Sequence, residues 1–211
     1  MTVDIAAAAQ EAGTVRKATE DEIPRIAAAL AQAFYDDPQF VWIIPDDARR
    51  LRILERAFEL FHRRAWLEQD EAYTTDSVVG AAVWERPGEW KLGIGKQLAM
   101  VPAMARVFGR YLPRVIRAIT AVESNHPEEL HYYLPFVGVV PGWQGRGLGA
   151  ALMHPILTRC DDESLPAYLE ASTPRNRALY ERHGFVVTEE FRLAKDAPLL
   201  WRMWRAPARQ D

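Results

Sequence analysis

A glycine-rich segment in the second half of the chain constrains the fold more than any other part of the sequence. It reads WQGRGLGA, spans residues 143–150 and holds three glycines within five positions. Glycines at this density do not build a core, but they let the backbone come close to another molecule. A predicted strand precedes this glycine loop and a predicted helix follows it. The loop therefore lies at a helix N-terminus, where N–H groups and the helix dipole favour an anion.

The glycine loop fits three interpretations, and the first is a plain turn in which glycines relieve backbone strain. The second is a dinucleotide fingerprint, because Gly145, Gly147 and Ala150 fit G-x-G-x-x-G/A and Glu170 ends the next predicted strand. Against it, residues 141–144 separate the fingerprint from the preceding strand. A doubly wound fold also needs several further strand–helix units, for which too few residues follow the loop.

The third interpretation is a different phosphate-binding loop, with the spacing Gln144-x-x-Gly147-x-Gly149. Small residues at a helix N-terminus let the phosphates of a ligand reach the backbone N–H groups. A second motif follows the next predicted strand, where Asn176 and Tyr180 begin the pattern N-x-x-x-Y-x-x-x-G-F. The dinucleotide interpretation leaves this second motif without a role.

Together the two motifs resemble the acetyl-CoA loop and the following helix of the GNAT acetyltransferase superfamily, whose loop signature is Q/R-x-x-G-x-G/A. Within that superfamily, the sequence is most similar to the puromycin N-acetyltransferase-like group, which also carries a proline in the place of Pro155. The resemblance is good over the C-terminal half and thinner toward the N-terminus. It is not visible from about Gly88 to Pro127, so it implies a cofactor and a chemistry but no acceptor.

The resemblance implies acetyl-CoA as the cofactor and assigns contacts to it along a strand, the glycine loop and the next helix. The residues so assigned are Val137, Gly138, Val139, Gln144, Gly145, Arg146, Gly147, Leu148, Gly149, Ala150 and Asn176. The strand backbone is expected to lie alongside the pantetheine arm. Gly138 is expected to mark a bulge that frees an N–H for the thioester carbonyl, and the amide near Val139 to stabilise the oxyanion.

Two side chains carry the predicted chemistry. The resemblance assigns Tyr180 as the acid that protonates the departing thiolate, and a phenol with a pKa of about 10 keeps its proton at neutral pH. Asn176 and Tyr180 are four residues apart and so share one helix face. Glu170 stands where some family members hold the base, and a purely structural carboxylate is the alternative. Further candidates, acting through water, are His131, Glu128 and Glu129.

Hydrophobic periodicity and turn signals predict the other elements. Strands are expected at 14–17, 72–75, 78–85, 131–140, 167–172, 185–191 and 199–205. Helices are expected from the Thr19–Glu22 capping box to about 36, and at about 46–67, 148–160 and 174–183. Residues 88–127 keep helical periods interrupted by glycines and prolines, and we interpret them as a helical insertion.

The order of these elements predicts an α/β (α+β) fold of the GNAT type. We expect a mixed, mostly antiparallel central sheet with helices on both faces and a helical insertion between strands 3 and 4. Residues 1–13 are expected to form a flexible N-terminal extension. Residues 14–206 are then a single acetyltransferase domain, with the insertion at about 88–127.

Composition excludes several classes of partner. The net charge is −3 and the pI about 6.0, so no basic field predicts nucleic-acid binding. Neither an eighteen-residue apolar run nor a secretion signal is found, so no membrane association is expected. The single cysteine, Cys160, is consistent with a reducing compartment. These features predict a cytoplasmic protein, and no metal site is predicted.

The predicted function is transfer of acetyl from acetyl-CoA to a primary amine of a small molecule, by direct attack within a ternary complex. Alternatives are protein N-terminal or lysine acetylation and a non-catalytic CoA-binding sensor module. A homodimer stays open. Acidic and aromatic residues between the first two helices suit a cationic acceptor, or else cap helices and fill the core. They are Asp36, Asp37, Phe40, Trp42, Asp46 and Asp47.

Overall fold

Seven strands form one mixed sheet in the order β1-β2-β3-β4-β5-β7-β6 in this computed structural model, which describes residues 12–208. The strands are β1 Val15–Lys17, β2 Ala72–Thr75, β3 Gly80–Glu85, β4 Tyr132–Val139, β5 Ala167–Ala171, β6 Val186–Arg192 and β7 Leu199–Arg205. Only β4 and β5 pair in parallel, and the other neighbouring pairs are antiparallel. The predicted mixed, mostly antiparallel sheet is confirmed.

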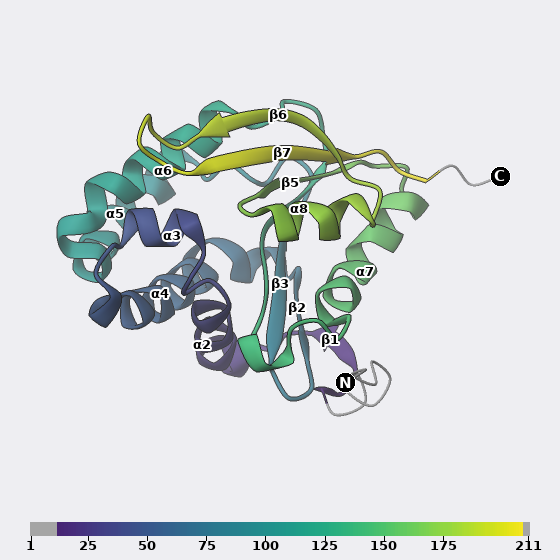
Figure 1. Cartoon of the computed structure of the whole chain (residues 1–211), viewed down its shortest axis with the longest axis horizontal. Coiled ribbons are helices and arrows are strands. Elements are labelled where there is room, and N and C mark those ends of the chain that lie inside the picture. Colours follow the sequence, from purple (N-terminus) through teal and green to yellow (C-terminus); the bar gives the residue numbers. More distant parts are fainter. Residues whose placement is uncertain (1–11, 209–211) are drawn as a thin grey trace.

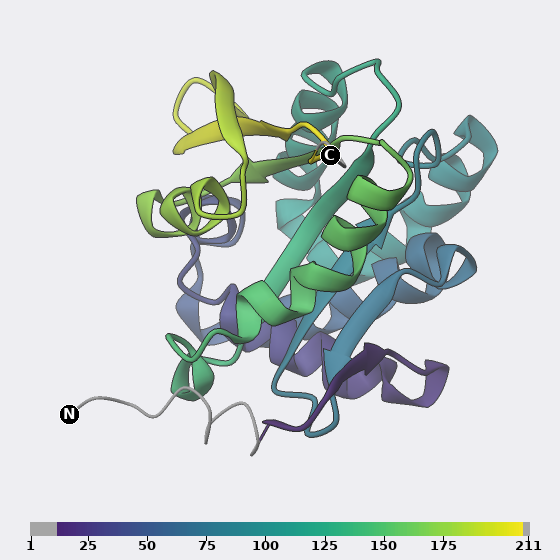
Figure 2. The same cartoon turned by 90° about the vertical axis from the view of Figure 1, so that its right-hand side faces the viewer.

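Helices cover both faces of the sheet, as predicted. They are α2 Ile23–Ala33, α3 Pro38–Ile43, α4 Asp47–Phe61, α5 Ile94–Phe108, α6 Leu112–Ser124, α7 Leu148–Asp162 and α8 Pro174–Glu181. Successive strand residues face opposite sides. On β3, Ala81 and Val83 therefore join the core under α2, α4, α5 and α6, whereas Ala82 and Trp84 join the core under α7. Figure 2 shows α7 lying across the near face of the sheet.

The long segment between β3 and β4 is helical and contains α5 and α6. The helix α3 is a correction to the sequence analysis, which placed no element between about 36 and 46. It begins with Pro38 in its first turn, and the Asp37 carboxylate accepts the Gln39 N–H at 2.9 Å. Helix α4 ends at Phe61. A π-helical turn follows at His62–Trp66 and a 3-10 turn at Leu67–Gln69.

The strands β4 and β5 separate soon after they begin. They pair only at Tyr132 with Ala167 and at Tyr133 with Tyr168, although β4 continues to Val139. In Figure 1, β2 and β3 run up the view while β5, β6 and β7 run across it. Beyond Tyr133, the edge of β4 that faces away from β3 therefore has no strand hydrogen-bonded to it among the described residues. We call this stretch, residues 134–139, the open edge of β4.

The bulge in β4 lies elsewhere than predicted. Gly138 pairs in register with Ala81, whereas the irregularity falls between the pairs Val83–Phe136 and Glu85–Tyr133. Two β4 residues, Leu134 and Pro135, thus stand opposite one β3 residue, and a bulge is where a strand tolerates proline. A Cβ on Gly138 would lie 2.8 Å from the Cβ of Ala33, so this glycine lets α2 pack closely on β4.

Two predictions concern the chain beyond this core. Residues 1–11, which hold most of the predicted extension, lie outside the described residues. Ala12 is buried and its carbonyl accepts the Ser77 N–H at 3.2 Å.

Within residues 12–208, no helix has the length and apolar character needed to cross a membrane.

Candidate active site

The glycine loop joins the end of β4 to the start of α7. After Val140 the chain makes a tight helical turn at Pro141–Trp143 and then takes positive φ angles of 78° at Gly145 and 78° at Gly147. Gly147 is the residue directly before α7, in the left-handed conformation that favours glycine. The strand–loop–helix unit predicted from the glycine spacing is therefore present.

The loop presents main-chain donors. Within the described part of the chain, no backbone acceptor is paired with the N–H groups of Gly145, Gly147, Leu148, Gly149 or Ala150. The first backbone bond of the helix runs from the Ala151 N–H to the Gly147 carbonyl at 3.0 Å. These donors add to the positive end of the α7 dipole, and the loop sequence has no acidic residue. An anionic group fits this position.

Gln144 holds the loop in place with its side chain. Its Nε2 donates to the Val139 carbonyl at 3.0 Å, and its Oε1 accepts from Arg175 Nη1 at 3.1 Å. The amide thus ties the end of β4 to the start of α8. Both polar atoms of its side chain are engaged within the chain, and its backbone N–H donates to the Pro141 carbonyl at 3.3 Å. The contact of Gln144 with the cofactor stays a prediction.

The open edge of β4 presents further backbone donors. The Val140 N–H donates to the Val79 carbonyl at 2.9 Å, which directs it toward β3. Because backbone groups alternate in direction along a strand, the N–H groups of Val139 and Val137 point away from β3, toward the gap beside β5. The bond from Gln144 to the Val139 carbonyl agrees with this direction. An extended ligand could pair with this edge in the manner of an added strand.

Helix α8 carries the predicted acid. Thr173 caps it by accepting the Asn176 N–H at 3.1 Å, and the Asn176 side-chain amide has no partner among the described residues. Tyr180, one turn later, is only 6% exposed. Burial, together with the nearby Asp37 carboxylate, raises the pKa of the Tyr180 phenol above its ordinary value. The phenol therefore stays protonated at neutral pH.

Asp37 and Ser172 link the region of Tyr180 to the α2–α3 connection. The Ser172 hydroxyl, directly after β5, donates to the Asp37 carboxylate, and burial raises the pKa of that carboxyl. The sequence analysis listed Asp37 among residues that could bind a cationic acceptor or cap a helix. It caps α3, and it also lies close enough to Tyr180 to affect the phenol's ionisation.

Glu170 lies between two tyrosines. Its Oε2 accepts from the Tyr133 hydroxyl and its Oε1 from the Tyr168 hydroxyl, each at 2.8 Å. Burial raises the pKa of Glu170 to about 7, against the opposing effect of these two hydrogen bonds and of Arg202. A carboxylate with such a pKa can accept a proton near neutral pH.

A second carboxyl, Glu85 at the end of β3, lies on the same face. It is paired in register with Tyr133, so the side chains of the two residues project to the same side of the sheet. Trp66 Nε1 donates to its Oε1 at 2.9 Å. Burial raises the pKa of Glu85 to about 8, and the charge of Glu170 adds to the shift. The sequence analysis did not identify Glu85.

Two histidines adjoin these groups. His131 Nδ1 lies 2.5 Å from the Glu129 carbonyl, and its Nε2 lies 2.9 Å from Nε2 of His126. Because the carbonyl can only accept, His131 carries its proton on Nδ1 and His126 donates from Nε2. Burial lowers the pKa of both rings. Both nitrogens of His131 are thus engaged, and the Glu128 and Glu129 side chains are exposed.

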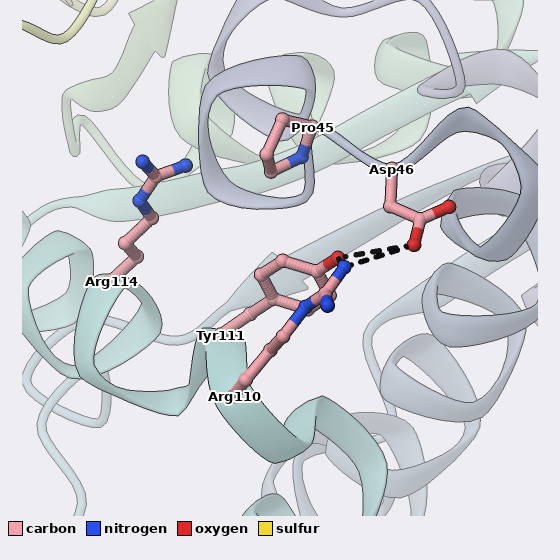
Figure 3. Close-up of a pocket in the computed structure, with 5 residues that line it drawn as sticks. All are labelled: Pro45, Asp46, Arg110, Tyr111 and Arg114. Atoms are coloured by element: carbon pink, nitrogen blue, oxygen red, sulfur yellow. Dashed lines mark hydrogen bonds and ion pairs between the residues drawn. The ribbon is translucent and has the colours of Figure 1, made fainter.

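A separate open cavity of about 490 Å³ lies where the α3–α4 connection meets the junction of α5 and α6. It is lined by Pro45, Asp46, Arg110, Tyr111 and Arg114. Figure 3 shows Arg110 and Tyr111 reaching toward the same Asp46 carboxylate oxygen, at 3.1 and 3.4 Å. Arg114 donates to the Trp42 carbonyl at 2.7 Å. Asp46, which the sequence analysis listed among residues that could bind a cationic acceptor, is paired here with Arg110, and no residue assigned to acetyl-CoA or to catalysis lines this cavity.

The structure thus gathers the predicted residues along the line where β4 and β5 separate. The glycine loop lies at the end of β4, Glu170 lies on β5, and Asn176 and Tyr180 follow on α8. The sequence analysis did not identify Glu85 or Tyr168 and did not join Tyr133 to Glu170. The alternation Tyr168-x-Glu170 could have placed Tyr168 on the face of Glu170, but only strand register adds Tyr133 and Glu85.

Comparisons with known proteins agree with this arrangement. A model of the acetyltransferase (GNAT) family matches residues 27–185. An uncharacterised N-acetyltransferase of Schizosaccharomyces pombe is 28% identical over 187 residues, covering 82% of this chain and 74% of that protein.

Solved structures extend the likeness to nearly the whole chain. A Corynebacterium glutamicum protein described as histone acetyltransferase HPA2 and related acetyltransferase is 28% identical, with a TM-score of 0.72 over 93% of this chain and 97% of that one. An agmatine N-acetyltransferase is 15% identical, with a TM-score of 0.62 over 92% of this chain and 98% of that one. At that identity, the second likeness shows the fold alone.

Proposed function

The chain belongs to the acetyltransferase (GNAT) family, and we propose that it transfers an acetyl group from acetyl-CoA to a primary amine of a small molecule, by direct attack in a ternary complex. The family shows that the chain is an acetyltransferase and that acetyl-CoA is its cofactor. The fold is that of this family. The identity of the acceptor and the roles of individual residues are the proposal.

The residues present fit the cofactor. The unpaired N–H groups at the start of α7 suit a pyrophosphate, and the loop around them has no side chain larger than that of Arg146 or Leu148 between Gly145 and Ala150. We assign the pyrophosphate to residues 144–150, the pantetheine arm to Val137, Gly138 and Val139, and a polar contact to Asn176.

The chemistry follows from three groups of this chain. When bound, the cofactor supplies an activated acetyl thioester. The Val139 N–H points toward the gap between β4 and β5, where it can stabilise a negative oxygen. Tyr180 holds a proton that it can donate to a leaving thiolate, and Glu170, directly or through water, can accept the proton of the attacking amine. The carrying observation is that β4 and β5 separate between the glycine loop and these two side chains.

A protein amine is the second candidate acceptor. The Corynebacterium glutamicum relative, described as a histone acetyltransferase, favours it. In this chain, α5 and α6 follow β3 and precede β4 in sequence, and this helical segment is suited to cover a small acceptor. The more specific likeness to the puromycin N-acetyltransferase-like group, a cytoplasmic location and a homodimer stay predictions from the sequence.

A thiol-release assay with acetyl-CoA tests the proposal. The panel contains small primary amines, lysine-containing peptides and peptides with free N-termini, and calorimetry measures CoA binding in parallel. We expect release with at least one small amine and little with the peptides. Release with peptides alone would replace the small-molecule proposal by the protein one. CoA binding without release from any acceptor would support a non-catalytic CoA-binding role.

A further inference from the structure

Glu85 has an unusual carboxylate for a buried residue. Glu85 is only 8% exposed, and its Oε1 accepts a hydrogen bond from Trp66 Nε1. Oε2 is buried and has no hydrogen-bond partner within residues 12–208, where it is the one carboxylate oxygen in that condition. No Lys, Arg or His of the described chain forms an ion pair with it. An ionised carboxylate is costly here without a donor, so Glu85 favours its protonated form until a cationic ligand supplies both a donor and a compensating charge.

The position of Glu85 relates it to the reacting centre. Tyr133 is its register partner on β4 and donates to Glu170 on β5, so the two carboxyls flank one tyrosine on one face of the sheet. Glu170 has both oxygens occupied by phenols. Glu85 has one oxygen left. A second polar group of an acceptor whose amine reacts near Glu170 would therefore have Glu85 as its partner on the same face of the sheet.

The surroundings of Glu85 specify the charge of that part. The indole of Trp66 that binds Glu85 packs against Phe136 and Phe61, with ring centroids 5.5 and 5.9 Å apart. Carboxylate oxygens and aromatic faces together bind ammonium and guanidinium groups, which donate N–H bonds and are attracted by ring quadrupoles. An anionic group would be repelled by the carboxylate, and a neutral donor would pair with its oxygen without balancing its charge.

We propose that the acceptor carries two cationic groups, one being the amine that is acetylated near Glu170 and the other an ammonium or guanidinium group bound by Glu85. This inference rests on the proposed function, since it concerns the acceptor of that reaction. It assigns Glu85 as the residue that selects a dicationic acceptor over a monoamine. Glu85 takes no part in proton transfer.

Matched acceptors test the inference. Linear diamines of three to six carbons are compared with the monoamines of the same length, and kcat/KM is measured for each by thiol release. For the preferred length, we expect the diamine to exceed its monoamine by at least about tenfold, the range of a charge-assisted bond. Equal values at every length would overturn the inference while leaving the proposed function intact.

The variant Glu85→Gln keeps the shape and an oxygen for Trp66 but cannot ionise beside a bound cation. It should reduce the ratio of diamine to monoamine kcat/KM to about one, mainly through a higher KM for the diamine. Glu190→Gln is the matched control, because Glu190 Oε1 also accepts an indole N–H, from Trp201 at 2.8 Å, but at an exposed position on β6. An unchanged ratio in Glu85→Gln would contradict the assignment.

Calorimetry separates the inference from turnover. The preferred diamine, or 1,4-diaminobutane if no amine is acetylated, is titrated into the full chain saturated with CoA. We expect binding that weakens at least about tenfold in Glu85→Gln and is unchanged in Glu190→Gln. Absence of binding to the wild-type chain would overturn the inference. Absence of thiol release with binding intact would instead overturn the proposed function.

Discussion

The two sides of the candidate site bind by different means. The glycine-loop side, residues 137–150 with Asn176 and Tyr180, offers mainly backbone N–H groups and the dipole of α7. The acidic side, Glu85, Tyr133, Tyr168 and Glu170, offers side chains from three strands. The first is positive in character and suits a phosphate; the second carries two carboxyls and suits an amine.

This difference has a structural cause. A phosphate can approach several consecutive main-chain N–H groups only where side chains are small, so glycines appear at fixed spacing in one short segment. Carboxylates and phenols act at a distance from their backbone, so residues far apart in sequence can share one site. The variants below test whether the two sides are as separate as this comparison implies, in order of decreasing effect.

The largest effect is expected from Gly147→Val on the glycine-loop side. A β-branched residue does not tolerate the φ of 78° found there, and its side chain would obstruct the loop N–H groups. We expect CoA affinity to fall by about a hundredfold or more, measured by calorimetry. Gly142→Ala is the control, because a Cβ there meets nothing within 4 Å. Retained affinity in Gly147→Val would mean that the loop is only a turn.

Tyr180→Phe should be next in size and should separate binding from catalysis. The phenyl ring keeps the packing, but the proton for the thiolate is lost. We expect kcat to fall by roughly ten- to a thousandfold with CoA affinity unchanged. Tyr35→Phe, which removes an exposed hydroxyl bonded to the Asp47 carbonyl, should leave kcat as it was. A wild-type rate in Tyr180→Phe would remove Tyr180 from the mechanism.

Glu85→Gln tests the acidic side through the pH dependence of the free energy of unfolding. The folded-state pKa of Glu85 is about 8 against an ordinary 4.5, so between these values the native state binds more protons than the unfolded state. Its stability therefore falls as pH rises through that window. Without this carboxyl, the free energy of unfolding of the variant should rise relative to that of the wild type by about 2 kcal/mol between pH 6 and pH 8, measured by chemical denaturation. Parallel curves would show that Glu85 does not titrate there.

The smallest effect is expected from Tyr133→Phe, on the pH dependence of kcat/KM. The Tyr133 hydrogen bond stabilises ionised Glu170, so its loss should raise the Glu170 pKa further above about 7. The rising limb of the profile should move to higher pH by about half to one unit. Tyr132→Phe is the control, since Tyr132 faces the other side of the sheet and bonds Glu163. A limb that stays in place would argue against Glu170 as the base.

Much of the fold could be predicted because its signals are local. Strand alternation, the Thr19–Glu22 capping box and the glycine spacing placed nearly all the elements. The helix α3 was missed because six residues give too little periodicity, and its signals, Asp37 followed by Pro38, were interpreted as a helix end. The bulge was assigned to Gly138 because glycine commonly marks bulges, whereas here it accommodates α2.

The sequence by itself determined the glycine-loop side of this protein. The spacing of Gln144, Gly147, Gly149, Asn176 and Tyr180 is confined to two short segments, and local backbone geometry makes each spacing meaningful. Only the tertiary structure decided the acidic side. Register brings Glu85 beside Tyr133 and Tyr133 beside Tyr168, and register depends on long-range pairing that no local pattern encodes. Burial then raises the pKa of both carboxyls, because desolvation is a property of the packed molecule.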